Sequence, residues 1–95
     1  MNSRYEVVVK IRTPTGYADT GIFSLGTDLD FARSTFNSFK GNTDDSHDAA
    51  IRLCLMEKIG QTSQKQLRSM GCRLSEYVEN SKTIAREVFK LLNLK

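Results

Sequence analysis

The feature that most constrains this fold is a long amphipathic segment at the end of the sequence, residues 74–94. Its apolar residues recur at steps of three and four, which places them on one stripe of an α-helix. They are Leu74, Tyr77, Val78, Ile84, Ala85, Val88, Phe89, Leu91 and Leu92. Because such a stripe needs a cover, we expect the upstream strands to pack against it. Replacing Val88 or Phe89 by alanine should then cost ~2–5 kcal/mol.

Two segments near the start of the sequence have the pattern of strands. Residues 5–13 alternate, with Tyr5, Val7, Val9 and Ile11 on one side and mostly charged residues on the other. Residues 17–25 are also strand-like, and a Thr-Pro-Thr-Gly connection separates the two segments. Proline suits the second position of a turn, and glycine tolerates the positive φ that ends it. We therefore expect an antiparallel hairpin.

A first helix is predicted over residues 28–40. Thr27 or Asp28 can cap its start, because a side-chain oxygen there accepts a hydrogen bond from an amide of the first turn. Gly41 is a suitable stop. The apolar face of this helix consists of Leu29, Ala32, Phe36 and Phe39.

The second half of the chain begins with a further strand. Ile51, Leu53 and Leu55 alternate with a mixed set of residues, which indicates a strand that is central or covered on both sides. Residues 65–72 fit either a fourth strand, returning as a hairpin, or a short helical turn. We favour the strand.

These elements follow one another in the order β-β-α-β-(β)-α. Ninety-five residues suffice for one domain, residues 1–95. We predict an α+β fold, with a small, mainly antiparallel sheet of three or four strands and two helices packed on one face. The connection through the first helix could join parallel or antiparallel strands.

The sequence favours a cytoplasmic protein. The apolar run near the start is flanked by Glu6 and Lys10, unlike the core of a signal peptide. No segment approaches the roughly 20 apolar residues that cross a bilayer, so we expect no membrane association. Cys54 and Cys72 are too few and too far apart for a disulfide scaffold, and we expect buried thiols.

We expect neither a metal nor a cofactor, and no enzymatic activity. The acidic loop of residues 42–48 has oxygen ligands at alternate positions. However, it has His47 where a calcium loop has glycine and Leu53 where it has glutamate. His47 is the only histidine and is expected to be exposed. Nucleotide-binding glycine loops and serine-nucleophile motifs are not found in the sequence.

Nucleic-acid binding is the alternative function that the charges suggest. Residues 49–95 carry nine basic and four acidic side chains, whereas residues 1–48 carry five and seven. Seven basic residues of the strands and the following segment could contact phosphates. They are Lys10, Arg12, Arg52, Lys58, Lys65, Arg68 and Arg73. The predicted strand faces that carry them lack an aromatic residue on which a base could stack.

Protein–protein interaction is the function that we favour from the sequence. If helices cover only one side of the sheet, three apolar residues are not expected to be buried in the core. They are Val8, Phe31 and Met56. A small domain with such residues can complete its burial against another protein, and a homodimer is one form of this contact.

Overall fold

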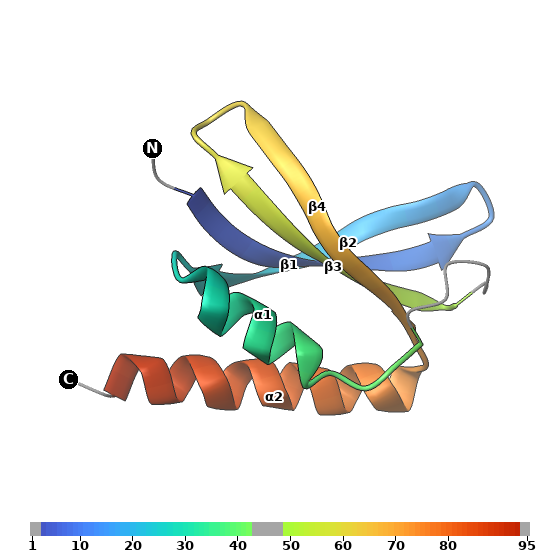
Figure 1. Cartoon of the computed structure of the whole chain (residues 1–95). Helices are drawn as coiled ribbons and strands as arrows, with labels where there is room; N and C mark the ends of the chain where they lie inside the picture. Colours follow the sequence, from blue (N-terminus) through green and yellow to red (C-terminus); the bar gives the residue numbers. More distant parts are fainter. Residues whose placement is uncertain (1–2, 43–48, 94–95) are drawn as a thin grey trace.

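The computed structural model describes residues 3–42 and 49–93. Its elements are β1 (Ser3–Thr13), β2 (Gly16–Gly26), α1 (Leu29–Asn37), β3 (Ile51–Ile59), β4 (Ser63–Cys72) and α2 (Leu74–Asn93). The strands form one sheet in the order β2-β1-β3-β4, and every neighbouring pair is antiparallel. Figure 1 shows both helices on the same side of this sheet. The predicted α+β fold is therefore confirmed.

The two central strands supply much of the core. On β1 the buried residues Tyr5, Val7 and Val9 alternate along the strand, as predicted, and point toward the helices. Val7 lies opposite Leu55 of β3, and Val9 lies opposite Leu53. Because β2 and β3 both run antiparallel to β1, the connection through α1 joins two parallel strands that are not neighbours.

Strand β4 settles the ambiguous segment. Residues 65–72 belong to a strand, and its register with β3 shifts by one residue between Leu55 and Met56. Leu67 is the extra residue of this β-bulge, because Arg68 and Gln66 pair with consecutive residues of β3. The bulge interrupts the period-two pattern, which explains why the sequence also fits a helical turn.

Helix α1 begins where the sequence predicts and ends earlier. The side chain of Asp28 caps it by accepting hydrogen bonds from the amides of Asp30 and Phe31, at 2.9 and 3.3 Å. The helix ends at Asn37, three residues before the predicted Lys40, yet Phe39 beyond it is still buried in the core.

Helix α2 departs most from expectation. Ile84 is buried, and Tyr77 and Val88 pack partly against the core. Phe89, however, is 66% exposed, so the prediction that it anchors the core is wrong. The apolar positions from Leu74 to Phe89 span roughly 140° of the helix circumference at about 100° per residue. The sheet and α1 cover only one edge of that arc.

Candidate interaction surface

The most prominent exposed feature is an apolar stripe along one side of α2. We define the α2 stripe as Leu74, Val78, Ala85 and Phe89. Leu74 is 67% exposed and Val78 is 42% exposed, and Ala85 and Phe89 are exposed as well. These positions lie within about 60° of one another on the helix. They therefore form one continuous band that follows α2 for four turns.

Two hollows adjoin the α2 stripe, one toward each end. Toward the C-terminal end, a cavity of about 330 Å³ lies between α2 and β2, where Phe23 and Ser24 face Ile84, Ala85, Val88 and Phe89. At the start of α2, a cavity of about 670 Å³ is lined by Leu74 together with Ile11, Pro14 and Ile51, among others. Ile11 points to the helix side of the sheet but is itself exposed. On the helix side of the sheet, α2 therefore covers β1 and β2 only in part.

Charged residues of both signs border the α2 stripe. The Nζ atom of Lys82 lies 3.6 Å from a carboxylate oxygen of Glu79, and both side chains are more than half exposed. Arg86 lies one turn further along α2, and its Nε atom is 3.7 Å from Glu87. Glu79, Lys82 and Arg86 occupy the flank of the stripe that is turned away from the core.

The opposite flank of α2 is fixed by a buried polar residue. Asn80 is 1% exposed, and its side-chain amide exchanges two hydrogen bonds with the backbone of Lys40, at 2.7 and 2.8 Å. Asn80 also donates to the Sγ atom of Cys72 at 3.4 Å. Burial, followed by the nearby charge of Glu76, raises the pKa of the Cys72 thiol to about 11. This cluster holds α2 against the segment after α1.

Asn80 is not among the residues predicted to have a functional or structural role. The signal was its spacing, because Asn80 lies three residues after Tyr77 and four before Ile84. A polar residue at that position of the core-facing side must find hydrogen-bond partners in the interior.

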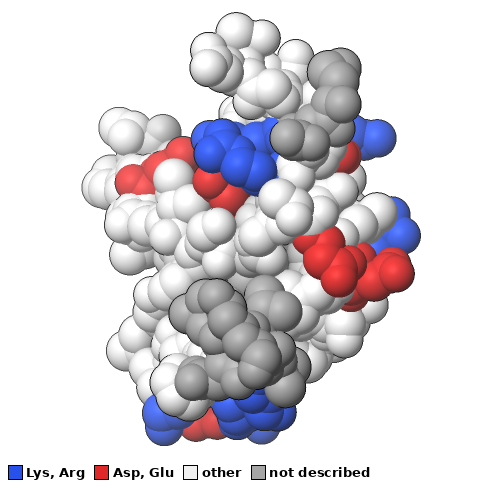
Figure 2. All heavy atoms as spheres, turned by 90° about the vertical axis from the view of Figure 1, so that its left-hand side faces the viewer, with Lys and Arg blue, Asp and Glu red and all other residues white. Residues whose placement is uncertain are grey.

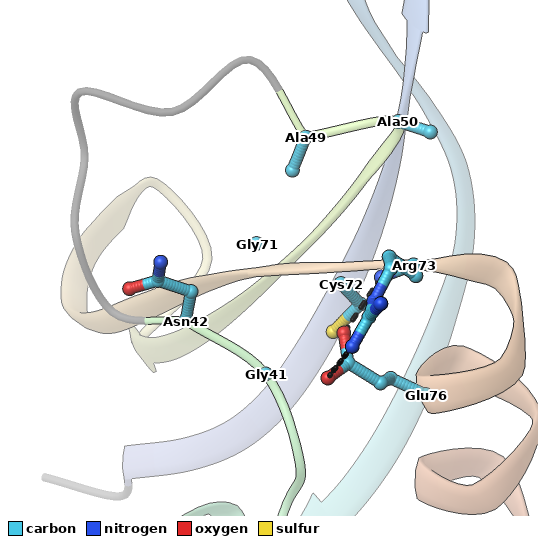
Figure 3. A pocket seen from close by; sticks show the side chains of 8 residues that line it. All are labelled: Gly41, Asn42, Ala49, Ala50, Gly71, Cys72, Arg73 and Glu76. Atoms are coloured by element: carbon cyan, nitrogen blue, oxygen red, sulfur yellow. Dashed lines mark hydrogen bonds and ion pairs between the residues drawn. The ribbon is translucent and has the colours of Figure 1, made fainter.

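A further cavity of about 530 Å³ lies beside the end of β4, between the segment after α1 and the start of β3 (Figure 3). Asn42 and Gly71 exchange two backbone hydrogen bonds there, at 2.9 and 2.7 Å. Arg73 and Glu76 are turned toward each other in Figure 3, with the Arg73 guanidinium 3.7 Å from the carboxylate. The other lining residues that the structure describes have small or uncharged side chains, and Cys72 and Asn42 are the two polar ones among them.

Four of the seven predicted phosphate-contacting residues share the outer face of the sheet, the face away from the helices. They are Lys10 and Arg12 of β1 and Arg52 and Lys58 of β3, and Lys10 lies directly opposite Arg52. Carboxylates interrupt this group, because Lys10 pairs with Asp19 at 3.2 Å and Lys58 pairs with Glu6 at 3.5 Å. Arg52 donates a hydrogen bond to Ser69 at 3.0 Å.

The other three predicted residues lie elsewhere. Arg68 points to the helix side, where its guanidinium lies 6.0 Å from the centre of the Phe36 ring and donates to Asn37. Lys65 lies opposite Glu57 in the register, and Arg73 follows the end of β4. On the side of the molecule drawn in Figure 2, basic groups directly adjoin acidic ones. The seven residues are therefore not brought together in one patch.

The residues predicted as an interface also divide between two faces. Val8 lies on the outer face opposite Cys54, and it is only 8% exposed. Met56 is half-buried on the same face, whereas Phe31 is half-buried against the core on the helix side. The exposed apolar surface of α2 was not part of that prediction, because its residues were assigned to the core.

Within residues 3–42 and 49–93, no three His, Cys, Asp or Glu side chains gather as a metal ion would require. The acidic loop weighed as a calcium site, including His47, falls mainly on residues 43–48, outside the described part of the chain. Of the helices described, none combines the length and apolar character needed to cross a membrane.

Comparisons with protein-family models, with curated proteins and with solved structures find no match to this chain. The function proposed below therefore depends on the residues and geometry of the molecule itself.

Proposed function

We propose that this chain is a protein–protein interaction domain and that the α2 stripe is its contact surface. The observation that carries the proposal is the exposure of three large apolar side chains, Leu74, Val78 and Phe89, on one side of one helix. Single exposed apolar residues are common on soluble proteins. A continuous band that adjoins two apolar hollows is characteristic of a binding surface.

The energetic argument concerns the water that these side chains contact. Transferring one large apolar side chain from water into a protein interface contributes about 1.5–3 kcal/mol. Three such residues, with Ile11 and Phe23 beside them, provide the apolar centre of an interface. The charged flank of Glu79, Lys82 and Arg86 provides a polar rim, which matches the usual organisation of protein interfaces.

The proposed activity is contact formation without catalysis and without a cofactor. We also propose the cytoplasm as its location. The observation in favour is that Cys54 and Cys72 are both buried and are not joined by a disulfide, as is usual in a reducing compartment. They lie on opposite faces of the sheet, since Cys72 belongs to the core cluster and Cys54 alternates with core residues of β3.

The experiment compares proteins retained from an extract of the producing cells by the immobilised chain and by two variants. Val78→Glu places a charge in the α2 stripe, and Ile22→Glu places the same charge at an exposed apolar position of β2. We expect the first variant to lose the retained species and the second to keep them. Identical sets of retained proteins for all three chains would refute the α2 stripe as the contact surface.

A second candidate function is nucleic-acid binding by the outer face of the sheet. The observation that favours it is the shared position of Lys10, Arg12, Arg52 and Lys58, with Arg4 directly opposite Lys58. Rows of basic side chains on one sheet face can neutralise phosphates.

A further inference from the structure

We propose that the occupant of the α2 stripe is a second copy of this chain, and that the two α2 helices pair antiparallel about a two-fold axis near Ser81 and Lys82. This inference rests on the proposed function, because it names the partner for the same surface. Closed two-fold symmetry is the commonest arrangement of protein dimers, and it requires a surface that is complementary to itself.

The α2 stripe meets this requirement along its length. When two helices pair antiparallel about a point between residues 81 and 82, Leu74 of one copy lies opposite Phe89 of the other. Val78 then lies opposite Ala85. The band from Leu74 to Phe89 is about 22 Å long at 1.5 Å per residue. The small residues Ser81 and Ala85 near its middle allow the helix axes to approach to about 8–10 Å.

The charges beside the stripe are complementary in the same register. A two-fold axis perpendicular to the helix pair places the charged flank of one copy beside the charged flank of the other. Glu79 of one helix then lies at the height midway between Lys82 and Arg86 of the second helix. Measured along the helix axis, it is about 3 Å from each of them. The two Lys82 side chains approach each other near the two-fold axis. Each lies between Glu79 of its own helix and Glu79 of the second helix.

These charges contribute little in the isolated chain. The contact between Glu79 and Lys82 within one helix is exposed, and such surface pairs are worth only about 0–1 kcal/mol. In the paired register Glu79 gains two further cations, Lys82 and Arg86 of the second helix, along the polar rim of the apolar contact. Charge complementarity of this kind fixes the orientation and register of an interface.

The position of the second helix also fits the rest of the fold. Asn80 joins one flank of α2 to the segment after α1, so that flank is occupied. Between this core-facing side and the α2 stripe, the cavity next to β2 is lined by Phe23, Ile84 and Val88. A second α2 beside the first would therefore lie along the side of the helix that its own chain leaves exposed.

The test is a charge exchange between two versions of the chain, read as mass by light scattering over a concentration series. We expect the parent chain to be a dimer. The variant Glu79→Lys and the double variant Lys82→Glu with Arg86→Glu each place like charges together in the proposed pair. We expect each to raise the dimer Kd by about tenfold or more. A mixture of the two restores every opposite-charge contact and should recover the dimer of the parent.

Lys65→Glu is the matched control, because it reverses a charge near the start of β4, the strand at the opposite edge of the sheet from β2, and should leave the Kd unchanged. Circular dichroism verifies that each variant is folded. A parent dimer whose Kd is unaffected by both charge reversals would overturn the inference, as would a mixture that stays monomeric. A parent that is monomeric throughout, but whose binding to another protein is lost in Val78→Glu, would overturn the dimer and leave the proposed function intact.

Discussion

The side-chain amide of Asn80 substitutes for a β-strand partner of Lys40. Its Oδ1 atom accepts the Lys40 amide at 2.7 Å, and its Nδ2 atom donates to the Lys40 carbonyl at 2.8 Å. Forty residues separate the two in the sequence. This pair of bonds fixes α2 to the chain leaving α1, and it determines which side of α2 remains outside.

Replacing Asn80 by alanine should lower the free energy of unfolding by ~1–3 kcal/mol, because backbone groups of Lys40 lose their partner beside the core. Urea denaturation followed by circular dichroism measures this loss. Thr83→Ala is the control within the same helix, since it removes only a hydrogen bond from its own hydroxyl to the Glu79 carbonyl. Equal unfolding midpoints for the two variants would contradict the role given to Asn80.

The close contact between Gly41 and Gly71 leads to a second prediction. Gly41 has φ of +155°, and a Cβ atom there would lie 2.6 Å from the Gly71 carbonyl oxygen. Gly41→Ala should therefore destabilise the protein by about 1 kcal/mol or more, since the obstacle is backbone. Gly21→Ala meets no atom within 4 Å and serves as the control. A thermal melt of Gly41→Ala that matches the parent would show that the two segments do not approach in this way.

The two phenylalanines Phe36 and Phe89 should respond oppositely to truncation. Phe36 is fully buried, so alanine in its place leaves a cavity and should cost ~3–5 kcal/mol. Phe89→Ala should change the stability of the monomer by no more than about 0.5 kcal/mol, because the ring is mostly in water. Chemical denaturation at low protein concentration tests both. If Phe89→Ala lowered the free energy of unfolding as much as Phe36→Ala, Phe89 would have to be buried in the core.

Much of the fold follows from the sequence because alternation reports burial on a strand directly. The sequence predicts a hairpin of residues 5–13 and 17–25, and β1 and β2 differ from these ranges by at most two residues at an end. The strand order was beyond reach, because it depends on contacts between segments far apart. That Val8 is buried on the outer face reflects this order, since β1 lies between β2 and β3.

The contact surface on α2 cannot be predicted from the sequence for a different reason. A helical pattern shows that an apolar arc exists on α2, but it does not show how much of the arc the rest of the chain covers. Ile84 and Phe89 are both apolar members of that arc, yet one is buried and the other exposed. Which edge is covered depends on Asn80, whose hydrogen-bond partner Lys40 lies forty residues away and cannot be identified from the sequence.

The Cys72 thiol predicts how stability changes in alkaline solution. Its pKa is raised to about 11 in the folded protein, from 9.0 as the ordinary value. Between these pH values the folded state holds a proton that the unfolded state has released. Stability from this group is therefore complete below pH 9 and is lost progressively as the pH rises toward 11. In urea titrations, the parent should lose stability between these pH values more steeply than Cys72→Ala. Parallel pH profiles would contradict the raised pKa.

The outer face of the sheet yields the prediction that separates nucleic-acid binding from protein contact. If this face binds phosphates, the affinity for labelled RNA or DNA should fall steeply with salt, and Arg12→Ala and Arg52→Ala should each reduce the salt slope by about one. Arg68→Ala should leave the slope unchanged, because that guanidinium lies over Phe36 on the helix side. Fluorescence anisotropy at low and near-physiological salt measures these slopes. Absence of binding at low salt, where attraction to phosphates is strongest, would exclude this function and leave the α2 stripe as the working surface.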